Sequence, residues 1–410
     1  MMKILYISYS CNPFNGSEDQ IGWNVPVECS KQGNDVFVIT KSEHKENVDK
    51  FLSTHPDIKI SFFYVDVPKI YRSVFKGIFY SLRIILWQKR AFKMANTICK
   101  QNEIEIIHQV APVEFRAFGN YGKIKNTRFV IGPIGGGFPV PKQFKHYLKS
   151  HFFSEFLRHF FNRLSFASLR IGKRIKRCDY IYFTNEESLR VFEKHKLIEN
   201  CNKSELLCDV GVDYGDINKS NTNVIQGRFV FFVPGRLYYR KGQVFLLDAI
   251  ERMNCNKPFV VQIAGDGPLR KNLIKRINKS PYLCEHVELI GKIPFMEMKN
   301  AYEKCNAVIL PSFSEATGTV LIESLSFNKP FIACNRFGAR ILDNQKASWL
   351  YDGDTRDEMI NGLVHCMLEC IENPCLLTKK TNETYNVAIN YSWKNKVDRF
   401  LEKYKELLEK

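Results

Sequence analysis

Residues 228–250 read "RFVFFVPGRLYYRKGQVFLLDAI" and contain a complete strand–turn–helix unit. The β-rich run 228–235 ends at a turn that contains Gly235, and a helical stretch follows it. Similar β-rich runs, each followed by a turn and a helical stretch, recur at 258–267, 287–293, 306–312 and 329–335. Strands that alternate with helices predict right-handed βαβ units and a parallel sheet. The second half of the chain is therefore predicted to be a doubly wound α/β domain.

The first half shows the same alternation. A buried strand is predicted at 3–8, and the helix that follows runs to about Lys31, where Gly33 closes it. Further strands are predicted at 35–40, 59–65, 104–110, 128–134 and 180–185. We therefore expect two Rossmann-like domains, facing each other across a cleft at the carboxyl ends of their strands, where such folds bind ligands.

Polar residues at 213–227 mark the predicted boundary, because this stretch has little periodicity and is typical of a linker. The domains are accordingly placed at 1–212 and 228–390. Residues 391–410 form one amphipathic helical segment after the second domain.

Composition excludes a membrane-spanning or disulfide-rich protein. The chain has 410 residues, of which 45% are hydrophobic and 25% are charged, which is the balance of a soluble globular protein. The first residues show no signal peptide, and Lys76 and Arg83 interrupt the most apolar stretch at 74–90, so we expect a cytoplasmic protein. The 13 cysteines are dispersed and are interpreted as reduced thiols, with no metal site expected.

The net charge of +17 is concentrated in the first half. Residues 1–190 contain 29 Lys and Arg against 16 Asp and Glu. The excess is greatest at 68–93, with seven basic and no acidic residues, and at 139–178, with ten basic and one acidic residue. Aromatic residues alternate with the basic ones there. Three interpretations stay open: nucleic-acid binding, contact with an anionic membrane, and amphipathic helices with a solvated basic face.

Two glycine-containing loops follow strands of the first half. Gly16, Ser17 and Glu18 join the first strand to its helix, where free backbone amides can bind an anion. The second loop, "GPIGGG" at 132–137, allows either a close approach of the backbone to a ligand or a sharp turn.

Two further loops follow strands of the second half. Arg236 and Lys241 lie just before a helix, where two cations can neutralise a diphosphate, although exposed Arg and Lys are also common as solvated charges. Gly265 and Gly267 flank an aspartate in the next strand–helix turn. They indicate a tight turn or a close approach to a ligand.

Two carboxylates stand out in "LPSFSEATGTVLIESLSF" at 310–327. The amides of Gly318 and Thr319 at the helix start can hold a phosphate, and Glu323 lies one turn deeper on the face of Thr319. A carboxylate can accept hydrogen bonds from two vicinal hydroxyls, such as those of a ribose. Glu315, before the helix, can then face a group on the other side of the phosphate. The alternative is a capped helix with one surface and one buried glutamate.

Two other groups are weaker candidates. Asp352 and Asp354 form a D-x-D triplet that suits Mg²⁺ or, more simply, the cap of a helix. His108 ends a strand and is interpreted either as a substrate contact or as a structural histidine. No P-loop, Ser-His-Asp grouping or histidine-rich metal motif is present.

Together these motifs resemble the retaining glycosyltransferases of the two-domain GT-B type, specifically the large glycosyltransferase family 4. The resemblance covers both halves through "GSE…GW", "GRLYYRKGQVFLLDAI", "IAGDGPLR", "LIGKIP" and "PSFSEATGTVLIESLSFNKPFIA". The "GSE" loop together with "GPIGGG" is similar to a branch found in bacterial polysaccharide assembly.

The resemblance implies roles for these residues. Arg236 and Lys241 would contact a donor diphosphate, Glu315 the donor sugar near the reacting centre, and Glu323 the nucleotide ribose. The loops at Gly16, Ser17, Glu18, Gly235, Gly265, Gly267, Gly318 and Thr319 would line the donor. The implied reaction is a front-face transfer with retention, through an oxocarbenium-like state and without a required metal or cofactor. The segment 391–410 would return to the first domain.

Partners follow from the same resemblance: a nucleotide-sugar donor and a polysaccharide or lipid-linked acceptor, with peripheral contact to an anionic membrane and no nucleic acid. This chain departs from the family pattern at Asn15, at "GPIGGG" and at Arg340, which takes the position of a frequent glutamate. The alternatives are another GT-B enzyme that acts on nucleotide sugars, such as an epimerase, a phosphorylase, or a basic nucleic-acid-binding protein.

Overall fold

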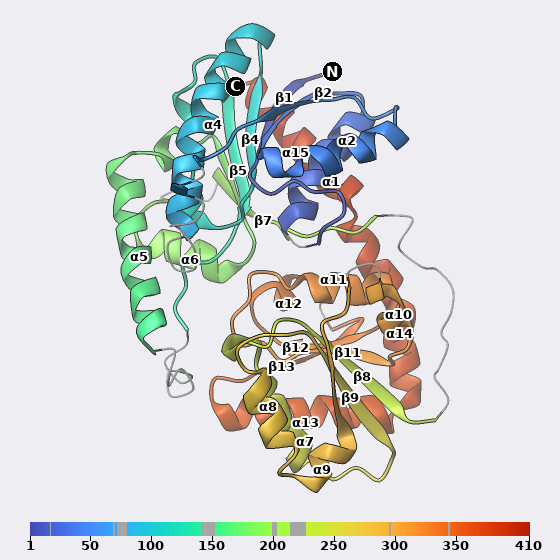
Figure 1. Ribbon diagram of the computed structural model, residues 1–410. Helices are drawn as coiled ribbons and strands as arrows, with labels where there is room; N and C mark the ends of the chain where they lie inside the picture. Colours follow the sequence, from blue (N-terminus) through green and yellow to red (C-terminus); the bar gives the residue numbers. More distant parts are fainter. Residues whose placement is uncertain are drawn as a thin grey trace. The chain divides into compact units, whose positions relative to one another are not determined.

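A computed structural model gives the fold of the chain (Figure 1). It describes residues 1–16, 18–68, 70–71, 80–140, 144, 152–198, 203–213, 227–294, 297–342 and 345–410. Ser17 and most of the predicted linker lie outside the described residues.

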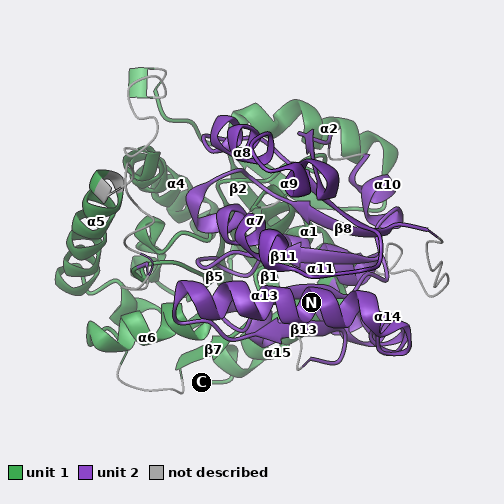
Figure 2. Cartoon of the chain, turned by 90° about the horizontal axis from the view of Figure 1, so that it is seen from below, with its two compact units in different colours: residues 1–139, 151–211, 393–410 green, residues 140–150, 212–392 purple. Residues whose placement is uncertain are grey.

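The chain divides into two compact units (Figure 2). Unit 1 contains Met1–Pro139, His151–Gly211 and Trp393–Lys410, and unit 2 contains Val140–Ser150 and Val212–Ser392. Val140 and Phe144, which the prediction placed in the first domain, belong to unit 2. The reason is apolar packing within unit 2, where the ring of Phe144 stacks on Phe313 at a centroid distance of 5.0 Å.

Unit 1 is built on a seven-stranded parallel sheet with the order β3-β2-β1-β4-β5-β6-β7. Its strands are β1 (Lys3–Ser8), β2 (Asp35–Thr40), β3 (Ile60–Tyr64), β4 (Ile106–Ala111), β5 (Arg128–Ile134), β6 (Tyr180–Phe183) and β7 (Ser204–Leu206). The sequence predicted the first six. It missed β7, because three half-buried residues are too few to show a periodicity.

Helices cover both faces of this sheet (Figure 1). They are α1 (Glu18–Lys31), α2 (Lys45–Thr54), α4 (Tyr80–Asn102), α5 (Phe152–Ile171), α6 (Glu186–Lys194) and α15 (Trp393–Leu408). Successive side chains of β1 point to opposite faces of the sheet. Leu5 and Ile7 pack with α4, whereas Ile4 and Tyr6 pack with α1 and α15. The C-terminal helix α15 therefore completes the core of unit 1.

Unit 2 is built on a six-stranded parallel sheet with the order β10-β9-β8-β11-β12-β13. Its strands are β8 (Phe229–Pro234), β9 (Phe259–Ala264), β10 (Val287–Gly291), β11 (Ala307–Leu310), β12 (Phe331–Cys334) and β13 (Ser348–Tyr351). The prediction found the first five and missed the edge strand β13.

The helices of unit 2 are α7 (Gln243–Arg252), α8 (Arg270–Ile277), α9 (Pro281–His286), α10 (Met298–Glu303), α11 (Thr319–Ser326), α12 (Phe337–Leu342), α13 (Arg356–Glu372) and α14 (Pro374–Ala388). One face of the sheet packs against α7, α9 and α13 in a single apolar cluster. On the other face, the ring of Phe232 meets that of Tyr302 from α10 at 5.3 Å. Both units are thus doubly wound, as predicted.

Among the described residues, none of the helices is both long and apolar enough to cross a bilayer.

Candidate functional site

Most of the candidate residues of unit 2 lie in the loops that follow the carboxyl ends of β8, β9, β10 and β11. A pocket of about 590 Å³ lies there. It is lined by Pro234, Gly235, Arg236, Ala264, Gly265, Asp266, Gly267, Lys292, Ile293, Met298 and Val320. The pocket therefore brings the loops after β8, β9 and β10 together with the start of α11.

The glycines of this pocket have two different roles. A Cβ on Gly265 would lie 2.0 Å from the carbonyl oxygen of Gly235, and one on Gly267 would lie 2.4 Å from that of Leu237. Both residues therefore allow the loops after β8 and β9 to pack backbone against backbone. Gly235 has a φ of +147° and open space where a Cβ would stand. Of the three, Gly235 is the one that leaves room at the pocket wall.

Lys241 and Glu315 form an ion pair between the loops that follow β8 and β11, and neither residue lines the pocket. Lys241 ends the short 3₁₀ turn Tyr239–Lys241 before α7, and Glu315 lies in the loop after β11. Their side chains are 28% and 15% exposed, so the pair is partly shielded from water. The sequence predicted each residue as a candidate but gave no sign that they pair.

Gly242 explains why these two loops meet, and sequence reasoning missed it. Its φ is +71°, and a Cβ there would lie 1.9 Å from the carbonyl oxygen of Pro311. The amide of Phe313 donates to the carbonyl of Arg240 at 3.1 Å, which joins the same two loops. The sequence "YYRKGQ" shows a glycine after a basic turn. It does not show that the loop containing Pro311 packs against that glycine.

Glu323 projects from α11 toward Tyr302 of α10. The Tyr302 hydroxyl donates to Oε2 of Glu323 at 2.7 Å. Burial raises the pKa of the Glu323 carboxyl, and this hydrogen bond acts against the increase. Tyr302 is fully buried and was not predicted as a site residue.

The start of α11 is open to an anion. Gly318 is its N-cap residue with a φ of +90°, and no side chain caps the helix. The first amides of a helix have no carbonyl partner within it, so those of Thr319 and Val320 can bind a ligand. The amide of Leu321, in contrast, donates to the carbonyl of Gly318 at 2.9 Å. Gly338 of α12 supports this loop, because its amide donates to the carbonyl of Ala316 at 3.2 Å. Arg340 points elsewhere, donating to the carbonyl of Asn335 at 2.7 Å.

In unit 1, Glu18 begins α1 directly after the loop that contains Gly16. Its Oε1 accepts a hydrogen bond from the amide of Val113 at 3.2 Å. Burial raises the pKa of Glu18 to about 7, with smaller contributions from neighbouring carboxylates such as Glu114. Glu18 is therefore partly protonated near neutral pH. The predicted role of Ser17 falls outside the described residues.

The "GPIGGG" loop serves packing at two of its glycines. A Cβ on Gly132 would lie 2.3 Å from the carbonyl oxygen of Tyr182, and one on Gly137 would lie 2.9 Å from the ring of Phe166. The amide of Gly136 donates to the Ser188 hydroxyl at 3.0 Å. The sequence left two explanations for these glycines, a close approach to a ligand and a sharp turn of the backbone. These contacts are all with other protein groups, so the sharp turn explains the glycines without a ligand.

His108 is a core residue, and this corrects its assignment to the catalytic group. It is 0% exposed. Its Nε2 lies 2.8 Å from the carbonyl oxygen of Gly132, and its Nδ1 pairs with the Tyr404 hydroxyl of α15. Burial lowers the pKa of His108 to about 3, so the ring is neutral. The structural alternative applies, because both ring nitrogens are occupied inside unit 1.

The Asp352 and Asp354 carboxylates are bound by protein groups. Asn335 donates to Asp352 at 3.1 Å, and Arg336 pairs with Asp354. The helix cap is Thr355, which forms a capping box with Glu358. Within the part of the chain that the structure describes, no three His, Cys, Asp or Glu side chains are grouped to hold a metal ion.

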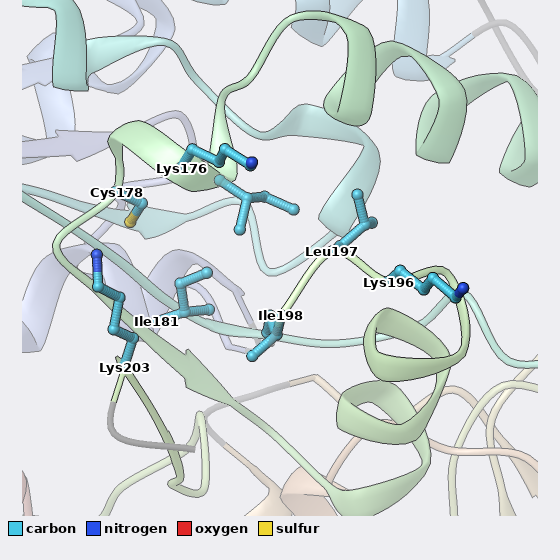
Figure 3. A pocket seen from close by; sticks show the side chains of 8 residues that line it. Lys176, Cys178, Ile181, Lys196, Leu197, Ile198 and Lys203 are labelled. Atoms are coloured by element: carbon cyan, nitrogen blue, oxygen red, sulfur yellow. The ribbon is translucent and has the colours of Figure 1, made fainter. Parts of the chain in front are cut away.

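A second pocket, of about 330 Å³, lies at the amino ends of β6 and β7 in unit 1 (Figure 3). It is lined by Ile175, Lys176, Cys178, Ile181, Lys196, Leu197, Ile198 and Lys203. None of the predicted site residues lines it.

Comparison with known proteins defines the class of this chain. Residues 216–374 match the family model described as glycosyl transferases group 1. Over 90% of this chain and 89% of the relative, it is 24% identical to an uncharacterized glycosyltransferase of Methanocaldococcus jannaschii. A 38% identical segment covers 24% of this chain and 26% of a Campylobacter jejuni N-acetyl-D-galactosaminyltransferase whose name specifies a diphospho-undecaprenol-linked saccharide.

Solved structures establish the fold. Anabaena HepE in complex with UDP aligns with a TM-score of 0.65 and 15% identity, covering 99% of this chain and 100% of that one. Sucrose-phosphate synthase from Thermosynechococcus elongatus aligns with a TM-score of 0.67 and 12% identity over 100% of both chains. The two doubly wound units are therefore those of the GT-B fold. The family match over residues 216–374 and the similarity to the Methanocaldococcus relative support a transferase enzyme.

Proposed function

We propose that this enzyme transfers a sugar, with retention of anomeric configuration, from a nucleoside-diphosphate sugar to a polysaccharide or lipid-linked oligosaccharide. The observation that carries the proposal is the Lys241–Glu315 ion pair at the strand ends of unit 2, beside the uncapped start of α11. A cation, free amides and a carboxylate in one place suit a diphosphate joined to a sugar.

The diphosphate is assigned to Arg236, Lys241 and the amides that follow Gly318. Arg236 is exposed at the wall of the pocket that Val320 of α11 also lines. Lys241 is paired with Glu315 before a donor arrives, so a diphosphate has to compete with this carboxylate for the ammonium group. Donor binding would then release Glu315 to interact with the sugar.

The nucleoside is assigned to Glu323. One of its carboxylate oxygens already accepts from Tyr302, which fixes the side chain on the inner side of α11. The other oxygen can accept from the hydroxyls of a ribose. Tyr302 is thus proposed as a positioning residue for Glu323.

In the reaction, the bond between the anomeric carbon and the β-phosphate oxygen breaks and leaves an oxocarbenium-like sugar. Negative charge develops on the departing diphosphate, and Arg236 and Lys241 stabilise it. The acceptor hydroxyl attacks from the side of the leaving group, which retains the configuration, and its proton passes to a phosphate oxygen. No residue needs to form a covalent intermediate in this scheme.

The acceptor class is supported by the relatives. The Campylobacter enzyme is named for an undecaprenol-linked saccharide, and a segment 29% identical over 34% of this chain occurs in O-antigen chain mannosyltransferase C of Escherichia coli. A lipid-linked acceptor would place the reaction at a membrane, and we propose a peripheral location on its cytoplasmic face.

The test is a panel of nucleotide sugars, in which nucleoside diphosphate release and thermal stabilisation are followed with the intact protein. We expect one base and one sugar to stabilise the wild type and to be hydrolysed or transferred. Lys241→Ala should release nucleoside diphosphate far more slowly, whereas Lys271→Ala, which changes an exposed lysine, is a control that should keep the wild-type rate. NMR of the product would report the anomeric configuration, and an inverted product would rule out retention.

A further inference from the structure

Helix α5 lies at one edge of unit 1 (Figures 1 and 2). It carries a row of exposed apolar side chains. Five of them are between 51% and 82% exposed, namely Phe153, Phe156, Phe160, Leu164 and Ile171. Isolated exposed apolar residues are common on protein surfaces, but a continuous patch of them marks an interaction site.

The row is one narrow stripe. At about 100° per residue, these five positions fall within a sector of roughly 80° around the helix axis. The stripe runs from Phe153 to Ile171, about 27 Å at a rise of 1.5 Å per residue. Asn162, Phe166 and Leu169 lie on the opposite side and are buried against unit 1. Packing inside unit 1 therefore uses one face of α5 and leaves the other face to solvent.

The exposed charged side chains of α5 itself have a single sign. Glu155 is the only acidic residue in 139–178, and its side chain is 5% exposed and paired with Arg158 at 2.8 Å. Arg163 and Arg170 are exposed on the helix, and Lys173 and Lys176 are exposed just after it. The solvent-facing charge of α5 is therefore basic.

We propose that α5 docks unit 1 on an anionic lipid surface, lying parallel to it with the phenylalanine stripe inserted at the interface. A basic amphipathic helix with Phe and Leu on one face is the structure that binds in this way. Two copies of this chain joined through α5 would bring their arginines and lysines together, which charge opposes. Nucleic acid would satisfy the basic residues but would leave the aliphatic Leu164 and Ile171 without a partner.

The proposal goes beyond the transfer reaction and does not depend on which donor or acceptor is used. It is tested first by co-sedimentation of the whole protein with vesicles of phosphatidylglycerol and phosphatidylcholine, against vesicles of phosphatidylcholine alone. We expect binding to the anionic vesicles that decreases in 0.5 M NaCl. Phe156→Ser combined with Phe160→Ser should weaken it by about tenfold or more, because two phenyl groups leave the interface.

The matched control is Ile290→Ser combined with Leu408→Ser, since these residues are exposed apolar side chains of β10 and α15 that do not belong to the stripe. The control variant should bind as the wild type does. Both variants change exposed residues, and unchanged thermal unfolding will confirm that they fold. Binding that persists undiminished in the Phe156/Phe160 variant, or no binding by the wild type at low salt, would overturn the proposal.

Insertion is measured by fluorescence. All four native tryptophans, Trp23, Trp87, Trp349 and Trp393, are at most 3% exposed. A tryptophan introduced by Phe156→Trp should therefore be the one that brominated lipids in anionic vesicles quench, whereas Ile290→Trp should not be quenched. Equal quenching of the two variants would contradict docking through α5. Self-association of the wild type that the Phe156/Phe160 variant abolishes, without vesicle quenching, would identify the stripe as an interface between copies instead.

Discussion

At the scale of single residues, the proposed chemistry of unit 2 rests on the Lys241–Glu315 pair. The cation and the carboxylate come from different loops, and neither has a partner close in sequence. Their pairing without ligand keeps both side chains in place at the strand ends. In the proposed site, Lys241 binds the diphosphate and Glu315 the sugar after the pair separates. Changing one residue should therefore affect the reaction differently from changing the other.

Removing Lys241 should affect charge development in the transition state more than donor affinity. We expect Lys241→Ala to lower kcat about 10²- to 10³-fold, the usual cost of losing one group that stabilises developing negative charge. Glu315→Gln should retain donor binding while lowering kcat. Steady-state kinetics with the donor found in the panel would measure both. A change confined to KM in either variant would contradict the proposed roles.

Glu18 should make stability depend on pH. Its pKa is raised by burial from 4.5 to about 7, so the folded state holds the proton more tightly than the unfolded state does. Its stabilising contribution is therefore complete below about pH 4.5 and is lost as the pH rises to 7. A shift of this size corresponds to roughly 3 kcal/mol.

The variant Glu18→Gln isolates this effect, because the amide oxygen can still accept the hydrogen bond from Val113. Urea unfolding at pH 5 and pH 8 should show that the variant is more stable than the wild type at pH 8, and that the difference shrinks toward pH 5. The same difference at both pH values would mean that the carboxyl does not titrate in this range.

At the scale of elements, α15 is held by a buried lysine. Lys396 is 4% exposed and donates to the carbonyls of Cys208 and Val210 at 2.5 and 2.6 Å. Burial lowers its pKa. The amphipathic pattern of 391–410 predicted the helix, but Lys396 looked like one more surface lysine, since its carbonyl partners lie almost 200 positions away. Long-range contacts of this kind leave no local pattern.

Lys396→Met should destabilise unit 1 by about 2–4 kcal/mol, because two buried carbonyls lose their donor. The control is Lys394→Met in the same helix. That residue is exposed and pairs with Asp398 at 2.7 Å, so its loss should cost about 0.5 kcal/mol or less. Urea titrations would measure the free energy of unfolding of both variants. An equal loss of stability in the two would disprove the structural role of Lys396.

The turn before α7 is the second element that decides the site. Gly242→Ala meets both an unfavourable φ and the carbonyl oxygen of Pro311, so the loops of Lys241 and Glu315 should separate. Gly291→Ala has a similar φ of +79° but nothing within 4 Å. We expect Gly291→Ala to cost about 1 kcal/mol in stability with activity retained.

Gly242→Ala should lose activity as well as stability. Thermal unfolding and turnover of the two alanine variants, compared side by side, separate backbone strain from the close contact. If Gly242→Ala keeps full turnover, the contact between the loops does not position the ion pair.

At the scale of the whole molecule, the two parallel sheets could be predicted because their central strands are buried, β-rich and regularly spaced. The strands β7 and β13 could not, since they have only three and four residues, too few to show a clear period. The place of Phe144 in unit 2 could not be predicted, because only its tertiary packing on Phe313 reveals it. The candidate loops were found from glycines and charges, while their partners Gly242, Pro311 and Tyr302 needed the structure.

His108 shows the opposite error at this scale. A histidine at the end of a strand is common in active sites, and the sequence could not show that Tyr404 from the last helix covers it. The sequence showed where the basic residues lie, but the exposed stripe on α5 is the observation that favours the proposed membrane contact over a merely solvated helix.

The most direct test of the central claim is turnover of nucleotide sugars by the wild type and by Lys241→Ala. The account predicts that the wild type releases nucleoside diphosphate from one donor and is thermally stabilised by it, and that Lys241→Ala releases it at least about 100-fold more slowly. If no nucleotide sugar in the panel stabilises or reacts with the wild type, or if Lys241→Ala turns over at the wild-type rate, the assignment of the donor site to the strand ends of unit 2 is contradicted.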